Sequence, residues 1–183
     1  DKQFDRARRK SNALLQRHPS AENYFQAAQV VTLQHPKGDE KFAQYLEQGY
    51  QLSDSRQKNL AARQSALYFL SQKRYAEAEK WAQKIDGADY AFDKSALLAS
   101  IALAQKQWQT AYRYAQDAHK QPRNDNSILS EDEFADIYAY AFAEALPPEQ
   151  AIAELTKEIE HTEKDRKNPK YARLLSTWLY QRG

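Results

Sequence analysis

The chain has 183 residues, with 27 Lys and Arg against 25 Asp and Glu, so its formal net charge is only +2. A balance this close to neutral gives no dominant electrostatic attraction to nucleic acid or to an anionic membrane. The absence of cysteine excludes disulfides and thiolate metal sites, and no stretch approaches the roughly 18 apolar residues of a membrane span. Scarce glycine and proline with abundant Ala, Gln, Lys, Glu and Leu favour helix over strand.

Helix-ending and helix-starting residues divide the chain into about ten predicted helices. Pro19 and the segment 36–39 interrupt the helical pattern, and Gly87 can take the left-handed conformation that ends a helix. Ser130 and Glu133 have the spacing of a capping box. The predicted helices cover residues 3–17, 20–34, 39–52, 56–72, 75–85, 91–105, 108–120, 131–146, 148–163 and 168–182.

A small residue returns every 33 to 40 positions, at Ala7, Ala43, Ala78, Ala111 and Ala151. A period in this range is typical of stacked helical hairpins. In two places an aromatic residue precedes this alanine by three positions, namely Tyr75 and Trp108. Because small side chains let two helices approach closely, we expect the alanines to lie at helix crossings, with the aromatic residues filling the gaps between hairpins.

This pattern resembles the tetratricopeptide repeat family, whose unit has small residues at its eighth and twentieth positions and aromatic residues between them. Phe69 and Phe142 match the eleventh position, and Tyr75 and Trp108 match the seventeenth. The resemblance implies an all-α, right-handed superhelical solenoid of antiparallel helical hairpins. It covers nearly the whole chain as a single array, with a half-repeat at 1–19, repeats at about 20–54, 55–88, 89–124 and 131–166, and a half-repeat at 168–183.

The chain departs from the family pattern in two respects. The proline expected at position 32 is replaced by Tyr90 and Arg123 in the two central repeats, and the third repeat has an insertion at residues 121–130. We expect this insertion to lie exposed on one edge. The repeat pattern begins at a second helix and stops at a first helix, which predicts a segment of a longer array whose ends bind neighbouring repeats or copies.

The sequence gives little support for catalysis, and we expect no catalytic residue, cofactor or metal. The four histidines are scattered, and only His161 has carboxylates at helical spacing, Glu158 and Asp165. A solvated histidine near a helix end explains that grouping better than a metal site. The basic run at residues 6–10 is spread around its helix and is read as a solvated face, and most aromatic residues fall at packing positions of the repeat.

In proteins of the resembled family, the first helix of each hairpin lines a concave groove that holds partner peptides or helices. Mapping the groove onto this chain gives a surface that is apolar in the middle, acidic toward the third repeat and basic at the end. Apolar anchors with a charged rim suit a protein ligand. The mapped residues are Glu22, Phe25, Gln29, Arg63, Leu67, Leu70, Asp93, Ala96, Ser100, Leu103, Glu133, Asp136, Tyr140, Glu144, Lys170, Arg173 and Tyr180.

We therefore expect a non-enzymatic scaffold or adaptor that binds another protein, with neither nucleic acid as partner nor direct membrane insertion. The groove lacks the Lys, Arg and Asn set with which related chaperone-tail binders clamp a carboxylate. Its acidic residues would repel the phosphates that related RNA binders hold. Three alternatives stay open: a periplasmic segment of a bacterial envelope-assembly or polysaccharide-export machine, a helical accessory domain of a larger enzyme, and an oligomerisation module. A periplasmic or envelope location is weakly favoured over the cytoplasm.

Overall fold

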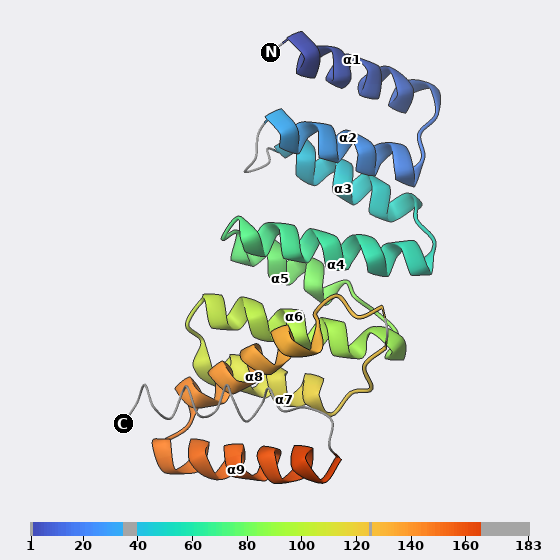
Figure 1. Ribbon diagram of the computed structural model, residues 1–183. Helices are drawn as coiled ribbons and strands as arrows, with labels where there is room; N and C mark the ends of the chain where they lie inside the picture. The colour runs from blue at the N-terminus through green and yellow to red at the C-terminus, as the bar shows by residue number, and fades with distance from the viewer. Residues whose placement is uncertain (1, 35–39, 125, 166–183) are drawn as a thin grey trace. The chain divides into compact units, whose positions relative to one another are not determined.

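The computed structural model describes residues 2–34, 40–124 and 126–165, and every regular element within them is helical (Figure 1). The predicted all-α class is confirmed, whereas the predicted helix at 168–182 lies outside the described residues. The chain divides into two compact units, residues 1–85 and residues 86–183, and each is described by itself. The elements are α1 (Lys2–Arg17), α2 (Ala21–Gln34), α3 (Glu40–Leu52), α4 (Ser55–Ser71), α5 (Tyr75–Gln83), the 3-10 turn η1 (Ala88–Tyr90), α6 (Ala91–Ala104), α7 (Trp108–His119), α8 (Glu131–Ala145) and α9 (Pro148–Asp165).

A capping box starts α4 in the first unit, and another starts α8 in the second. Glu133 N–H donates to the Ser130 hydroxyl at 3.2 Å, and Ser130 N–H donates to the Glu133 carboxylate at 2.7 Å, so the predicted capping box of α8 is confirmed. Asp54 and Gln57 form a second capping box at the start of α4. Both boxes satisfy amide groups that the first turn of a helix leaves without partners.

Two lysines in the left-handed conformation end α4 and α6. Lys73 has a φ of 58° and Lys106 a φ of 59°, values that side-chain-bearing residues rarely adopt. In both turns, the lysine N–H and the following N–H donate to carbonyl groups of the preceding helical turn, which is the pattern of a Schellman motif. These bonds are each 2.9 Å long: Lys73 to Leu70, Arg74 to Phe69, Lys106 to Leu103, and Gln107 to Ala102. The same turn therefore closes one helical hairpin in each unit.

In the first unit, successive helices pack as neighbours, with α2 against α3 and α4 against α5 (Figure 1). α1 packs on α2, and α3 also contacts α4. Ala66, Ala78 and Ala82 are fully buried at the contact of α4 with α5. Phe69, which is also fully buried, packs edge-on against Phe42 of α3 at 5.6 Å between ring centroids. Small residues thus bring the paired helices together, as the repeat pattern predicts.

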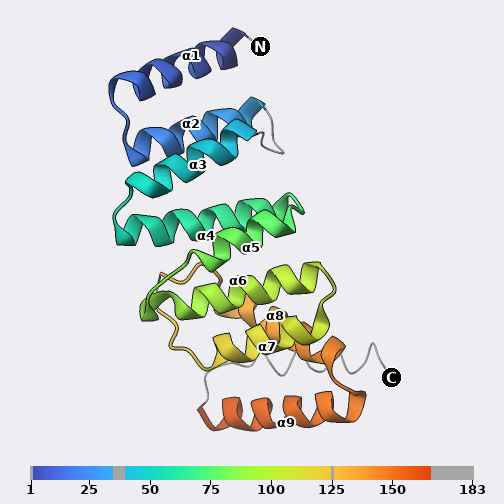
Figure 2. The ribbon, with the colours of Figure 1, turned by 180° about the vertical axis from the view of Figure 1, so that it is seen from behind.

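In the second unit, α6 pairs with α7, and α8 packs against both of them (Figure 2). The core combines fully buried small residues with a cluster of aromatic rings. Ala99, Ala111 and Ala151 are fully buried. The rings of Phe92 on α6 and Phe134 on α8 meet edge to face at 4.9 Å between centroids. This aromatic contact fills the space between α6 and α8.

The insertion at 121–130 is exposed only in part. Gln121, Pro122 and Arg123 lie exposed, as predicted, but the prediction is wrong for residues 127–129, which pack inward. Ile128 N–H donates to the carboxylate of Asp93 on α6 at 3.0 Å, and Leu129 is buried. Because the buried Asp93 carboxylate needs a hydrogen-bond donor, the end of the insertion is held against α6.

Candidate functional site

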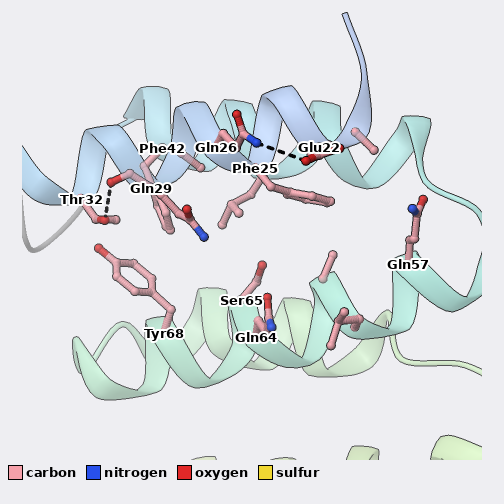
Figure 3. A pocket seen from close by; sticks show the side chains of 15 residues that line it. Glu22, Phe25, Gln26, Gln29, Thr32, Phe42, Gln57, Gln64, Ser65 and Tyr68 are labelled. Atoms are coloured by element: carbon pink, nitrogen blue, oxygen red, sulfur yellow. Dashed lines mark hydrogen bonds between the residues drawn. The ribbon is translucent and has the colours of Figure 1, made fainter. Parts of the chain in front are cut away.

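A pocket of about 580 Å³ lies in the first unit between α2 and α4 (Figure 3). Residues of α2, α3 and α4 line it. Its volume is in the range of pockets that hold small ligands or short segments of a chain. The lining residues are Ala21, Glu22, Phe25, Gln26, Ala28, Gln29, Thr32, Phe42, Leu46, Gln57, Leu60, Ala61, Gln64, Ser65 and Tyr68.

The floor of the pocket is apolar and buried. Ala28 of α2, Phe42 and Leu46 of α3, and Ala61 of α4 line it, and each is less than a tenth exposed. Leu60, by contrast, lines the pocket with 49% of its surface exposed. An exposed leucine above an apolar floor gains free energy when another apolar group covers it. The pocket therefore offers an anchoring place for one apolar side chain.

Phe25 can line the pocket because α3 carries a glycine opposite it. A Cβ atom on Gly49 would lie 2.7 Å from Cε1 of the Phe25 ring and 2.9 Å from its Cδ1. These distances are shorter than van der Waals contact, so only a residue without a side chain lets the ring lie against α3 in this way. A glycine inside a helix costs about 1 kcal/mol relative to alanine. In return for this cost, the glycine makes room for the Phe25 ring close to α3.

The two walls of the pocket carry opposed amide side chains. In Figure 3, Gln29 extends from α2 toward α4, while Gln64, Ser65 and Tyr68 extend from α4 toward α2. Within the described part of the chain, the Gln29 and Gln64 side chains have no hydrogen bond to another protein group, and both residues are exposed. An amide side chain offers both donors and an acceptor. Each wall thus presents a group that can pair with a peptide bond.

Three other polar residues of the lining, Gln26, Thr32 and Gln57, already have hydrogen-bond partners. The Gln26 amide donates to the Glu22 carboxylate at 3.2 Å, the Thr32 hydroxyl donates to the Gln29 carbonyl, and Gln57 belongs to the α4 capping box. Glu22 is the only charged residue among those that line the pocket. The pocket therefore has a weakly acidic rim and no lining cation that would attract a phosphate or a carboxylate.

Only some of the groove residues that the sequence predicts on α2 and α4 line this pocket. Phe25 and Gln29 line it, whereas Arg63, Leu67 and Leu70 do not. Arg63 is only 6% exposed, and Leu67 and Leu70 are half-buried. The residues of α4 that do line the pocket, and that sequence reasoning missed, are Leu60, Ala61, Gln64, Ser65 and Tyr68. Gln64 lies 35 residues after Gln29, and this spacing within the repeat period was a usable signal.

The remaining predicted groove residues belong to the second unit. Asp93 is 1% exposed and accepts the bond from Ile128, and the Ser100 hydroxyl donates to the Ala96 carbonyl within α6. Asp136 and Tyr140 are exposed on α8, while Glu144 is half-buried. Tyr140 meets the ring of Trp108 edge to face at 6.2 Å between centroids. Arg173 lies outside the described residues.

An ion pair of the first unit lies away from the pocket. Lys84 Nζ donates to the Glu47 carboxylate, and it stands over the rings of Tyr50, at 4.5 Å, and Trp81, at 4.1 Å. Burial alone would raise the pKa of Glu47, but the bonds from Lys84 and Gln51 outweigh burial and hold that pKa below its usual value. The ion pair and the two cation–π contacts link α3 to the end of α5, so they stabilise the packing of the first unit.

Metal sites and membrane spans were sought in the same residues. Among the residues whose side chains the structure describes, no three His, Asp or Glu come together as metal ligands would. The side chains of His161, Glu158 and Asp165, the one grouping with metal-like spacing, lie outside those that the structure describes. None of the described helices is long and apolar enough to cross a membrane.

Comparisons with known proteins give no relative on which a function could be based. No family model, no curated protein and no solved structure matches the chain.

Proposed function

We propose that this chain is a non-enzymatic protein-interaction scaffold. Its helical pairs would form a right-handed array of the tetratricopeptide type, and its groove would hold a segment of another protein. The observation that carries this proposal is the pocket between α2 and α4, with an apolar floor beneath amide-bearing walls. Apolar anchoring with polar groups around it is typical of sites that bind peptides.

The chemistry of the lining supports binding more than catalysis. Apart from Glu22, the groups that line the pocket are amides, hydroxyls and apolar side chains. None of the pairs expected of a nucleophile and its base, such as serine beside histidine, occurs among the lining residues. Amides and apolar groups recognise shape and hydrogen-bonding pattern, which is the task of a scaffold.

The test uses short random peptides displayed as a library and selected on the wild-type chain, with affinities then measured for synthetic copies. Leu60→Lys places a charge at the half-exposed anchoring position of the pocket, and we expect it to weaken binding at least tenfold. Leu52→Lys is the matched control, because Leu52 belongs to the same unit, is 53% exposed and does not line the pocket. The proposal fails if no peptide is selected, or if Leu60→Lys binds as well as Leu52→Lys.

The predicted contacts on α8 form a second candidate surface. Tyr140 is 48% exposed although its ring contacts that of Trp108, so part of the tyrosine side chain stays accessible to a partner. Aromatic residues held this way are common at the centres of interfaces. The double variant Tyr140→Ala with Asp136→Lys should leave helicity unchanged and weaken binding of partners that use this surface. Unchanged affinity for every selected peptide would remove α8 from the proposal.

A further inference from the structure

We propose that the pocket between α2 and α4 takes an extended peptide segment and reads its backbone through Gln29 and Gln64. This inference rests on the proposed function and specifies the conformation and chemistry of the partner. The proposed occupant is a segment of another protein with one apolar anchoring side chain and a neighbouring Lys or Arg. Three observations support it: the free amides on opposite walls, the apolar floor between them, and the single carboxylate of Glu22.

The opposed amides favour an extended backbone over a helix. A helix pairs its own N–H and C=O groups internally, so a bound helix would leave Gln29 and Gln64 without backbone partners. An extended segment, by contrast, carries unpaired N–H and C=O groups along both of its edges. With Gln29 on the α2 wall and Gln64 on the α4 wall, each edge of the segment meets one amide (Figure 3).

The apolar floor suits the side chains of an extended segment, which point perpendicular to its hydrogen-bonding edges. Successive side chains of such a segment point to opposite faces. A segment whose edges face the two walls therefore points alternate side chains to the floor, where Phe42, Leu46 and Ala61 are buried. The next side chain points away from the floor to solvent. This geometry predicts one buried apolar position flanked by positions that face solvent at the rim of the pocket.

The charge of the pocket predicts which residue is preferred next to the anchoring side chain. Glu22 is the only charged residue that lines the pocket, and one of its carboxylate oxygens accepts from Gln26. A Lys or Arg beside the anchoring residue gains an ion pair with Glu22, whereas an Asp or Glu there is repelled. Because Glu22 is exposed, water screens this ion pair and the preference for Lys or Arg is modest.

The experiment begins with the peptides selected on the wild-type chain. Their affinities are measured for Gln29→Met and Gln64→Met, which keep the length and helix propensity of glutamine but remove the amide. Gln48→Met is the matched control, because Gln48 is an exposed glutamine of α3 that does not line the pocket. Each peptide is also made with single N-methyl groups on its backbone. Thermal melts followed by circular dichroism confirm that all variants fold.

We expect each of the two pocket variants, and N-methylation at one or two central peptide groups, to weaken binding about tenfold. Gln48→Met should have no effect, and Glu22→Gln should reduce the preference for Lys or Arg. The inference is overturned if Leu60→Lys abolishes binding while the glutamine variants and N-methylation leave it unchanged, or if the bound peptide is helical by circular dichroism. Binding that is insensitive to Leu60→Lys overturns the proposed function itself, so the two failures are distinguishable.

Discussion

The two units of this chain place their first helices differently. In the second unit, α6 packs directly on α8, and the rings of Phe92 and Phe134 fill the space between them. In the first unit, α2 and α4 occupy the corresponding positions of their pairs, yet the pocket lies between them. The pairing within hairpins is alike in both units, down to the left-handed lysine turn. What differs is the side chains between successive helical pairs, which fill the space in the second unit and leave a pocket in the first.

The largest effect should come from removing the aromatic filling of the second unit. Phe134 is 5% exposed, and its ring contacts Phe92 and stacks on Tyr138. Phe134→Ala leaves a cavity, and we expect a loss of about 3–5 kcal/mol in the free energy of unfolding. Leu60→Ala, made at the half-exposed pocket of the first unit, should cost about 1 kcal/mol. If denaturant titrations gave equal losses in the free energy of unfolding for Phe134→Ala and Leu60→Ala, the contrast between the filled space of the second unit and the open pocket of the first would be wrong.

Gly49→Ala should make the first unit more like the second, because the added methyl group displaces the Phe25 ring into the pocket. The new Cβ atom would lie 2.7 Å from the Phe25 ring, so the ring must move toward the pocket. Overpacking typically costs about 1–3 kcal/mol, and the gain in helix propensity offsets about 1 kcal/mol of it. We expect a net loss of up to about 2 kcal/mol in the free energy of unfolding and at least tenfold weaker peptide binding, measured by denaturation and by titration. Unchanged binding would show that Phe25 does not shape the pocket.

The two capping boxes allow a comparison at matched positions. Asp54 caps α4 in the first unit and Ser130 caps α8 in the second. Asp54→Ala and Ser130→Ala should each cost about 1 kcal/mol. Ser130→Ala should also raise the pKa of Glu133, because the Ser130 hydroxyl and amide hold that pKa below its usual value. A titration of Glu133 by NMR that is unchanged in Ser130→Ala would contradict this assignment.

The lysine turns should respond equally in both units. Lys73 and Lys106 adopt left-handed conformations that glycine adopts without steric cost. We expect Lys73→Gly and Lys106→Gly to stabilise the protein by about 0.5–1 kcal/mol each, since the relief of steric cost exceeds the added entropy of the unfolded chain. Thermal unfolding of the two single variants measures this directly. A gain in only one of them would show that the two turns are not equivalent.

The smallest effect concerns the ion pair of the first unit. Because the folded-state pKa of Glu47 is lowered, its stabilisation is present above the unfolded pKa of about 4.3 and is lost as the pH falls through the folded value. The Glu47 side chain is 37% exposed, so water screens the pair and its contribution stays well under about 1 kcal/mol. Glu47→Gln should flatten the stability profile below pH of about 4.5. If stability depended on acid pH identically in wild type and Glu47→Gln, the ion pair would make no measurable contribution to stability.

Much of the helical architecture could be predicted from local sequence signals. Ser130 with Glu133 marked the start of α8, and Gly87 does adopt a positive φ of 95° at the turn before η1. The lysine turns could not be predicted, because lysine carries no preference for the left-handed conformation. Trp81 is buried, and its ring meets that of Tyr50 edge to face, a contact that the repeat pattern did not predict.

The site was less predictable than the fold because it depends on how each helix is rotated. The mapping from the resembled family places Phe25 and Gln29 on the groove side of α2, and in the structure both residues line the pocket. On α4, the predicted Arg63 is buried, and the next residue, Gln64, lines the pocket instead. Neighbouring residues differ by about 100° around a helix, so a shift of one position moves a side chain from groove to packing face. Three-dimensional packing sets that rotation, and the alanine period alone does not.

Gly49 also bears on how such a pocket can arise or disappear in evolution. A glycine codon becomes an alanine codon by one base change, and the added methyl group displaces the Phe25 ring toward the space where the partner would lie. One substitution in α3 can therefore close the pocket without altering any residue that would touch the ligand. Among related chains, the size of the residue at this position would serve as a marker of which members keep an open pocket.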